Sequence, residues 1–216
     1  MNDGSPRRRW IVDGTVDLVA AEVSWRAGDA RGTQSELRVH EHELGIQLAA
    51  GALARRLGTR VTSGDFTTPI CSTCGRQHGK PVVRQLIDAD FSISHSDGLV
   101  LVAICDRPVG VDVERNLPRD PNTLLQYLHP QEQAQVRQLE EGERAAAVLR
   151  CWVRKEACLK SVGLGLTEDL RRWKVLLRGP VLVAAPGGQR LQVRDLVRPD
   201  GVRACAAAVA IVVRER

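Results

Sequence analysis

The sequence predicts an α+β fold in which two halves each combine strands with helices. Along 216 residues the predicted elements follow the order strand, helix, strands, helices, strands, without a sequence repeat. A hydrophobic content of 43% is normal for a globular protein, and the length suits one domain or two small lobes sharing a core. We therefore expect residues 1–108 and 109–216 to be the N-terminal and C-terminal halves of one functional unit.

The N-terminal half begins with a polar, basic stretch, residues 1–10, which we expect to be frayed. Residues 16–25 predict a first strand. Ser35 is the candidate N-cap of a long helix that ends at Leu57, because leucines recur at near-helical spacing and Gly58 follows them. A loop rich in glycine and proline comes next.

Three short strands follow, at residues 91–94, 99–105 and 109–114. Residues 96–98 and 106–108 form the tight turns between them. The middle strand is apolar on both faces, so we expect it to lie in the centre of a sheet.

The C-terminal half predicts helices and then strands. Pro130 suits the first position of a helix, and Gly163 is a stop signal for the longest one. The expected helices are at residues 121–128, 130–141 and 144–162, and the expected strands are at 173–177, 181–183, 191–193 and 202–213.

The chain is basic, with a net charge of +5 and a pI of about 9.1. This balance favours anionic partners: nucleic acid, a phosphorylated small molecule or an acidic protein. Aromatic residues make up only 3% and no basic helix stands out, which counts against binding of nucleic acid. Six cysteines without a signal peptide predict a reducing, cytoplasmic location, and no apolar run is long enough to span a membrane.

A pair of carboxylates marks the strand at residues 109–114. The alternation of a strand turns its valines to the core and points Asp112 and Glu114 together the other way, about 7 Å apart at their Cα atoms. Two such carboxylates repel unless a cation lies between them, and oxygen ligands suit Mg²⁺. The alternative is an ordinary solvated strand face.

The longest predicted helix carries a second charged group. Trp152, Glu156 and Lys160 recur at i, i+4 and i+8 and share one face, while Lys155 is offset by one position. A carboxylate flanked by two lysines can hold a metal ion and a polyphosphate together. The alternative is an amphipathic helix with a surface Glu–Lys pair.

Two loop-proximal groups complete the candidate set. Ser94 and His95 end a strand, and a histidine with basic neighbours binds phosphate well. Lys80 precedes Pro81 in a segment that lacks the glycine spacing of a P-loop, but the proline fixes a loop in which Lys80 could meet a ligand.

These four groups, in their order along the chain, resemble the Sfp-type 4′-phosphopantetheinyl transferases, which activate carrier proteins of fatty-acid, polyketide and nonribosomal-peptide synthesis. The strings that carry the resemblance are residues 78–81 (HGKP), 91–96 (FSISHS), 109–114 (VGVDVE), 152–160 (WVRKEACLK) and 163–166 (GLGL). The Leu44-Gly45 pair of the first long helix extends the likeness upstream.

The resemblance implies a monomer with a pseudo-twofold arrangement of two similar α+β halves and coenzyme A bound between them. It implies transfer of the 4′-phosphopantetheine group of coenzyme A to a serine of an apo acyl or peptidyl carrier protein, with release of 3′,5′-ADP. The transfer would depend on Mg²⁺, with Mn²⁺ as an alternative. Neither nucleic acid nor a membrane is an implied partner.

The resemblance also implies roles for individual residues. Asp112, Glu114 and Glu156 hold the metal, and Asp112, Glu156 and Lys160 are the catalytic set, with Glu156 or Glu132 as the general base. The implied coenzyme A contacts are Lys160 and Lys155 around the pyrophosphate, His95 and Arg38 at the 3′-phosphate, and Lys80, Pro81 and Ser94 on the adenine side, with Asp112 also in the site.

The chain departs from the family pattern in two places. Glu41 stands where some relatives carry an arginine before Leu44-Gly45, which leaves Arg38, His42 and Arg31 as candidates for the 3′-phosphate.

The other departure is an insertion in which Cys71, Cys74 and His78 resemble half a zinc knuckle. They supply three ligands at most where tetrahedral zinc needs four, so we expect a reduced loop. Two alternative functions remain: a basic nucleic-acid-binding module with this half-knuckle, and a carrier-protein-binding homologue without catalysis.

Overall fold

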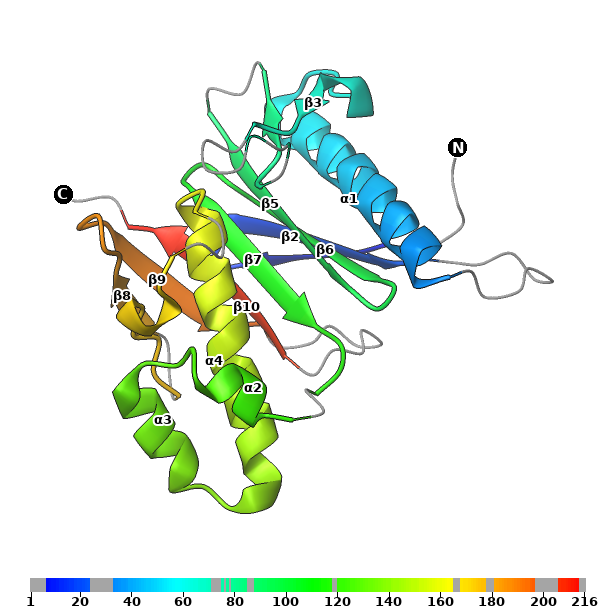
Figure 1. Cartoon of the computed structure of the whole chain (residues 1–216). Helices are drawn as coiled ribbons and strands as arrows, with labels where there is room; N and C mark the ends of the chain where they lie inside the picture. Colours follow the sequence, from blue (N-terminus) through cyan, green and yellow to red (C-terminus); the bar gives the residue numbers. More distant parts are fainter. Residues whose placement is uncertain are drawn as a thin grey trace. The chain divides into compact units, whose positions relative to one another are not determined.

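The computed structural model divides the chain into two compact units, Met1–Asp106 and Arg107–Arg216 (Figure 1). Each unit contains a four-stranded antiparallel sheet and one long helix, so the predicted α+β class is confirmed. The pseudo-twofold relation of the two halves stays a prediction. The structure describes residues 7–23, 33–70, 75, 77, 79–84, 88–117, 120–164, 168–177, 181–196 and 206–213.

The sheet of the N-terminal unit has the strand order β1-β2-β6-β5. Its strands are β1 (Arg8–Val12), β2 (Val16–Glu22), β5 (Asp90–Ser96) and β6 (Leu99–Cys105). Every residue of β6 is buried, and the strand lies between β2 and β5, so the expected central position is confirmed.

The expectation that residues 1–10 are frayed is wrong for β1. This strand pairs with β2 along its whole length, and Arg9 contacts Asp17 of β2 at 2.7 Å. Charged side chains are common on edge strands, where they discourage pairing with another chain. For that reason the Arg-rich sequence of this edge resembles a polar tail.

The long helix α1 (Gln34–Leu57) packs on β5 and β6 (Figure 1). Its N-cap is Thr33 rather than the expected Ser35: the Thr33 hydroxyl accepts from the backbone N–H of Glu36, and the Glu36 carboxylate accepts from the Thr33 N–H. This capping box satisfies two donors that the first turn leaves open. A short 3₁₀ turn, η1 (Ser63–Asp65), and the paired strands β3 (Phe66–Thr67) and β4 (Val82–Val83) complete the unit.

The sheet of the C-terminal unit has the strand order β7-β10-β9-β8. Its strands are β7 (Val109–Glu114), β8 (Val181–Ala184), β9 (Arg190–Asp195) and β10 (Ala206–Val212), and its helical elements are α2 (Asn122–Leu125), α3 (Pro130–Arg137), α4 (Glu141–Ser161) and η2 (Leu170–Arg172). No helix in the described ranges is long and apolar enough to cross a membrane.

Helix α4 covers one face of β7 and β10 at very short range (Figure 1). Gly110 pairs with Ala210, and Asp112 pairs with Ala208, so this face carries small side chains next to the carboxylate. A Cβ added at Gly110 would lie 1.9 Å from the carbonyl oxygen of Ala157 in α4. Both faces of β7 are therefore buried, and the alternative of a solvated carboxylate face is wrong.

The expected strand at residues 173–177 is wrong too. This segment follows η2 without pairing to any described strand, and its backbone is bound by buried side chains instead. Arg154 donates to the carbonyls of Val175 and Leu176, and Glu132 accepts from the N–H of Val175 at 2.6 Å. The apolar pattern predicted burial correctly, but side chains of α3 and α4 take the place of a neighbouring strand.

Candidate active site

A cluster of charged side chains lies where α4 crosses β7. Asp112 and Glu114 come from the strand, and Glu156 and Lys160 come from the helix. Asp112 is only 5% exposed, and the Lys160 ammonium lies 2.7 Å from its Oδ1 atom. The close approach at Gly110 holds the two elements together, so backbone packing brings these side chains to one place.

The pKa of Glu156 reflects its burial and its two carboxylate neighbours. Burial is the main factor that raises the pKa of Glu156 to about 7, and the nearby charges of Asp112 and Glu114 raise it further, while Lys160 opposes them. The Glu156 Oε1 atom is buried and has no hydrogen-bond partner in the described part of the chain. A cation bound here would relieve both the repulsion and the burial of this carboxylate.

The donor atoms fit a hard cation, although they do not form a ready-made cage. Asp112, Glu114 and Glu156 offer only carboxylate oxygens, the ligands that Mg²⁺ prefers. Among the described residues, no three His, Cys, Asp or Glu side chains are arranged to hold a metal ion. The fit therefore rests on the carboxylates of Asp112 and Glu114 near Glu156 and on the buried oxygen of Glu156.

Lys155 and Glu132, two further candidates from the sequence, lie away from any surface. Both are completely buried and form an ion pair of 2.8 Å. The Lys155 ammonium also donates to the carbonyls of Leu170 and Trp173, and Glu132 accepts from two backbone N–H groups, those of His129 and Val175. We therefore remove Lys155 from the coenzyme A contacts and Glu132 from the candidate bases.

A sequence signal for this role of Lys155 exists. Its helical neighbours at i−4, i+3 and i+4 are Cys151, Cys158 and Leu159, and all three are buried in the core of the unit. A lysine on an apolar helix face indicates a buried partner, here Glu132 of α3.

Replacing Lys155 by methionine is expected to destabilise the protein by about 3–5 kcal/mol, because Glu132 would remain buried without its counter-charge. Urea unfolding measures the loss. The matched control is Arg171→Met, which removes an exposed, solvent-screened pair with Asp169 and should leave the free energy of unfolding nearly unchanged. Equal losses for the two variants would contradict the structural role of Lys155.

In the N-terminal unit, His95 contacts a buried carboxylate. The His95 Nδ1 atom lies 2.9 Å from Glu41 Oε2, and the backbone N–H of Gly98 donates to Glu41 Oε1 at 2.6 Å. His95 is 36% exposed, Ser94 is buried, and Arg38 is exposed. Glu41 thus takes a defined place beside His95.

Lys80 and Pro81 also lie in the N-terminal unit. The Lys80 ammonium forms an ion pair with Asp90, and burial lowers the pKa of Lys80 while the Asp90 carboxylate opposes that shift. Pro81 lines a pocket of about 510 Å³, with His42 and Phe66 among the other lining residues. The partner Asp90 lies just before the strand predicted at residues 91–94, and nothing else in the sequence marks it.

Several sequence candidates lie outside the described residues. They are Arg31, the possible zinc ligands Cys71, Cys74 and His78, and the Gly165-Leu166 end of the last motif. The expectations for them stay predictions.

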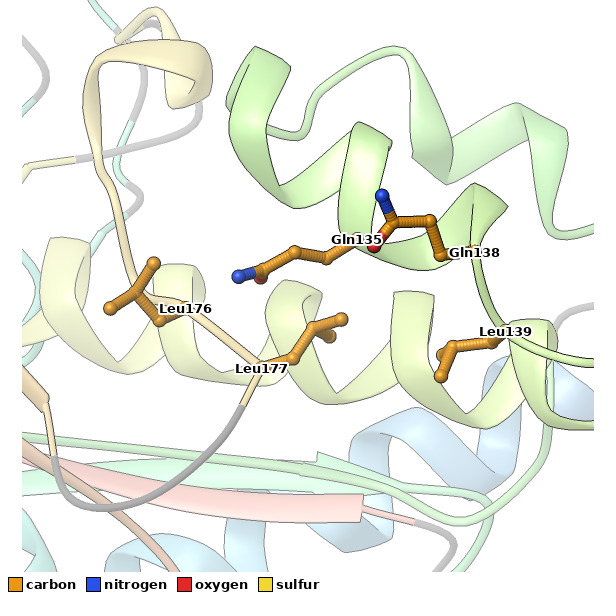
Figure 2. A pocket seen from close by; sticks show the side chains of 5 residues that line it. All are labelled: Gln135, Gln138, Leu139, Leu176 and Leu177. Atoms are coloured by element: carbon orange, nitrogen blue, oxygen red, sulfur yellow. The ribbon is translucent and has the colours of Figure 1, made fainter.

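A pocket of about 470 Å³ in the C-terminal unit does not contain the candidate residues. Figure 2 shows Gln135 of α3 pointing toward Leu176, with Gln138, Leu139 and Leu177 around the same hollow. None of these side chains is titratable, so the pocket offers no group for acid–base chemistry.

Comparisons with known proteins agree with the cluster on β7 and α4. Residues 108–193 match the family model described as the 4′-phosphopantetheinyl transferase superfamily. The chain is thus similar in sequence to 4′-phosphopantetheinyl transferases. It is 27% identical over 149 residues to 4′-phosphopantetheinyl transferase Sfp of Bacillus subtilis, and 33% identical over 90 residues to 4′-phosphopantetheinyl transferase gsp of Aneurinibacillus migulanus.

These alignments cover only part of each protein. They include 68% of this chain and 63% of Sfp, and 42% of this chain and 37% of gsp. A 4′-phosphopantetheinyl transferase of Bacillus subtilis is 28% identical over 115 residues, which are 52% of this chain and 51% of that relative. The segment that matches the superfamily contains Asp112, Glu114, Glu156 and Lys160, whereas Arg38, Lys80, Pro81, Ser94 and His95 lie before it.

Proposed function

We propose that this protein is a phosphopantetheinyl transferase of the holo-acyl-carrier-protein synthase type. It would move the 4′-phosphopantetheine group of coenzyme A to a serine of an apo acyl or peptidyl carrier protein, with release of 3′,5′-ADP. The observation that supports this most directly is the cluster of Asp112, Glu114, Glu156 and Lys160, which lies inside the segment that matches the superfamily.

Glu156 is the proposed general base. A base works best when its pKa is close to the working pH, and in the metal-free protein burial raises the pKa of Glu156 to about 7. Its carboxylate accepts the proton of the carrier serine while the serine oxygen forms a bond to the β-phosphorus of coenzyme A. The bond from that phosphorus to the bridging oxygen breaks, and 3′,5′-ADP leaves with the bonding electrons.

The other residues of the cluster would neutralise the charge of the pyrophosphate, either directly or by holding a cation. Lys160 places a fixed positive charge next to the carboxylates, where it can also meet the pyrophosphate. Asp112, Glu114 and Glu156 would hold Mg²⁺, which supplies charge neutralisation to the pyrophosphate when bound. Arg38 and His95 are assigned to the 3′-phosphate, and Lys80, Pro81 and Ser94 to the adenine side.

We propose a cytoplasmic monomer that meets acidic carrier proteins with its basic surface. Cys151 and Cys158 are buried thiols that form no disulfide, as expected for a reducing compartment. The net charge of +5 favours encounter with an acidic partner.

The test is the intact mass of an apo carrier protein after incubation with this protein, Mg²⁺ and coenzyme A. We expect a gain of one phosphopantetheine, none with a chelator present, and none on a carrier whose serine is replaced by alanine. Coenzyme A binding without ADP release would instead support a non-catalytic carrier-binding homologue. Salt-sensitive DNA binding without coenzyme A binding would support the nucleic-acid alternative.

Replacing Lys160 by alanine is expected to raise the KM for coenzyme A and to lower kcat. Its charge acts on the pyrophosphate in both the ground state and the transition state, so kcat/KM should fall by about 10- to 150-fold, the equivalent of one charged hydrogen bond. The exposed Lys174→Ala is the control and should change neither constant. An unchanged KM would remove Lys160 from the pyrophosphate site.

A further inference from the structure

Glu41 and His95 form a carboxylate–imidazole pair at the surface of the N-terminal unit. The Glu41 side chain is 2% exposed, whereas the His95 ring is 36% exposed. The buried partner is therefore the carboxylate, and the ring that it contacts reaches solvent. This is the arrangement of a group that orients a histidine for contact with something outside the protein.

A backbone hydrogen bond determines which oxygen of the Glu41 carboxylate contacts His95. The N–H of Gly98, a buried residue in the turn between β5 and β6, donates to Glu41 Oε1 at 2.6 Å. Oε2 therefore faces His95 Nδ1, at 2.9 Å. A carboxylate only accepts hydrogen bonds, so the proton in this contact belongs to Nδ1.

The position of that proton decides how His95 can bind an anion. A neutral imidazole has one N–H, and when that N–H is on Nδ1 the Nε2 atom carries a lone pair, which repels a phosphate oxygen. Only the imidazolium form has a second N–H, on Nε2, and a carboxylate beside the ring favours this charged form.

We propose that Glu41 is a positioning residue that holds the Nδ1 proton of His95 and so makes His95 bind the 3′-phosphate of coenzyme A as the imidazolium. This inference rests on the proposed function. The buried charge of Glu41 would act on the ligand through His95.

The first experiment reads the tautomer directly, by ¹⁵N NMR of the histidine rings in the full chain, with His95→Gln to assign the signals. We expect a protonated Nδ1 in the unaltered protein and protonation of both ring nitrogens when 3′,5′-ADP is added. In Glu41→Gln the amide oxygen must accept from Gly98, which turns the amide NH₂ toward His95. We therefore expect the ring proton to move to Nε2.

The second experiment measures affinity for coenzyme A and for dephospho-coenzyme A by calorimetry. The Kd for dephospho-coenzyme A divided by the Kd for coenzyme A reports the contribution of the 3′-phosphate alone. We expect this ratio to fall by about 5- to 10-fold in Glu41→Gln, because a charged hydrogen bond becomes a neutral one. In the His95→Gln background, Glu41→Gln should have no further effect on the ratio.

Glu36→Gln is the control on the same helix, since Glu36 only caps the first turn and should leave the ratio unchanged. A Nδ1 atom without a proton in the unaltered protein overturns the proposal, and this reading does not depend on the folding of any variant. An unchanged ratio in Glu41→Gln, or an additional loss in the His95→Gln background, overturns it as well. Failure of the proposed function looks different: the unaltered chain would bind neither ligand, whatever the tautomer of His95.

Discussion

Replacing Glu156 by glutamine is expected to leave coenzyme A binding in place and to lower kcat by about 10²- to 10⁴-fold, the range for loss of a general base. Glutamine keeps the shape of the side chain and one oxygen, but it cannot accept the serine proton. Calorimetry with coenzyme A and Mg²⁺ measures binding, and single-turnover transfer to an apo carrier protein measures the chemical step. A change in kcat without a change in binding is the signature of a group that acts in the transition state.

The same substitution is expected to stabilise the metal-free protein at high pH. The pKa of Glu156 is raised from 4.5 to about 7 in the folded state, so the folded state holds a proton that the unfolded chain releases. Stability is therefore lost as the pH rises from 4.5 to 7. Glutamine removes this loss, and in a chelator at pH 8 the variant should be more stable by about 1–3 kcal/mol.

Glu143→Gln is the matched control, an exposed glutamate in the first turn of α4 that should affect neither transfer nor the pH profile of stability. Near-normal transfer by Glu156→Gln would show that Glu156 is not the base. Glu132 would not replace it, because Lys155 and two backbone N–H groups already occupy its carboxylate.

Strands with a strong local pattern could be predicted from the sequence to the residue. Residues 99–105 and 109–114 were expected as strands, and β6 and β7 have those bounds. Two failures have a common cause, since partners distant in the sequence decided them. β1 is a strand because β2 pairs with it, and residues 173–177 pair with no described strand because Arg154, Lys155 and Glu132 bind their backbone.

The same contrast between local patterns and distant partners applies to the residues of the candidate site. The helical spacing of Glu156 and Lys160 and the alternation around Asp112 identified side chains that the structure brings together. The charge of Lys155 suggests a ligand for phosphate, but its burial depends on Glu132 in another helix, which the sequence pattern does not reveal. Glu41 was recognised only as a departure from the family, because its pairing with His95 joins residues 54 positions apart.

Gly110→Ala is expected to be among the most destabilising single substitutions in the chain, with a loss of about 3–5 kcal/mol. The added Cβ would lie 1.9 Å from the carbonyl oxygen of Ala157 and 2.4 Å from the backbone nitrogen of Ser161. Both atoms belong to the backbone of α4, so no side-chain rotation relieves the clash, and the helix must move away from β7. That movement also separates Glu156 and Lys160 from Asp112, so transfer should fall even at temperatures where the variant remains folded.

Gly142→Ala is the matched control for this substitution, because it lies in the first turn of the same helix and a Cβ there meets no atom within 4 Å. It should stabilise the protein by about 0.5–1 kcal/mol through the higher helix propensity of alanine. Thermal and urea unfolding measure the stability of both variants, and so compare the effect of close packing at α4 with the effect of helix propensity in α4. A free energy of unfolding for Gly110→Ala within about 1 kcal/mol of that of the unaltered protein would contradict this prediction. In that case α4 does not lie on β7 as closely as described, and the contact between Lys160 and Asp112 would be wrong too.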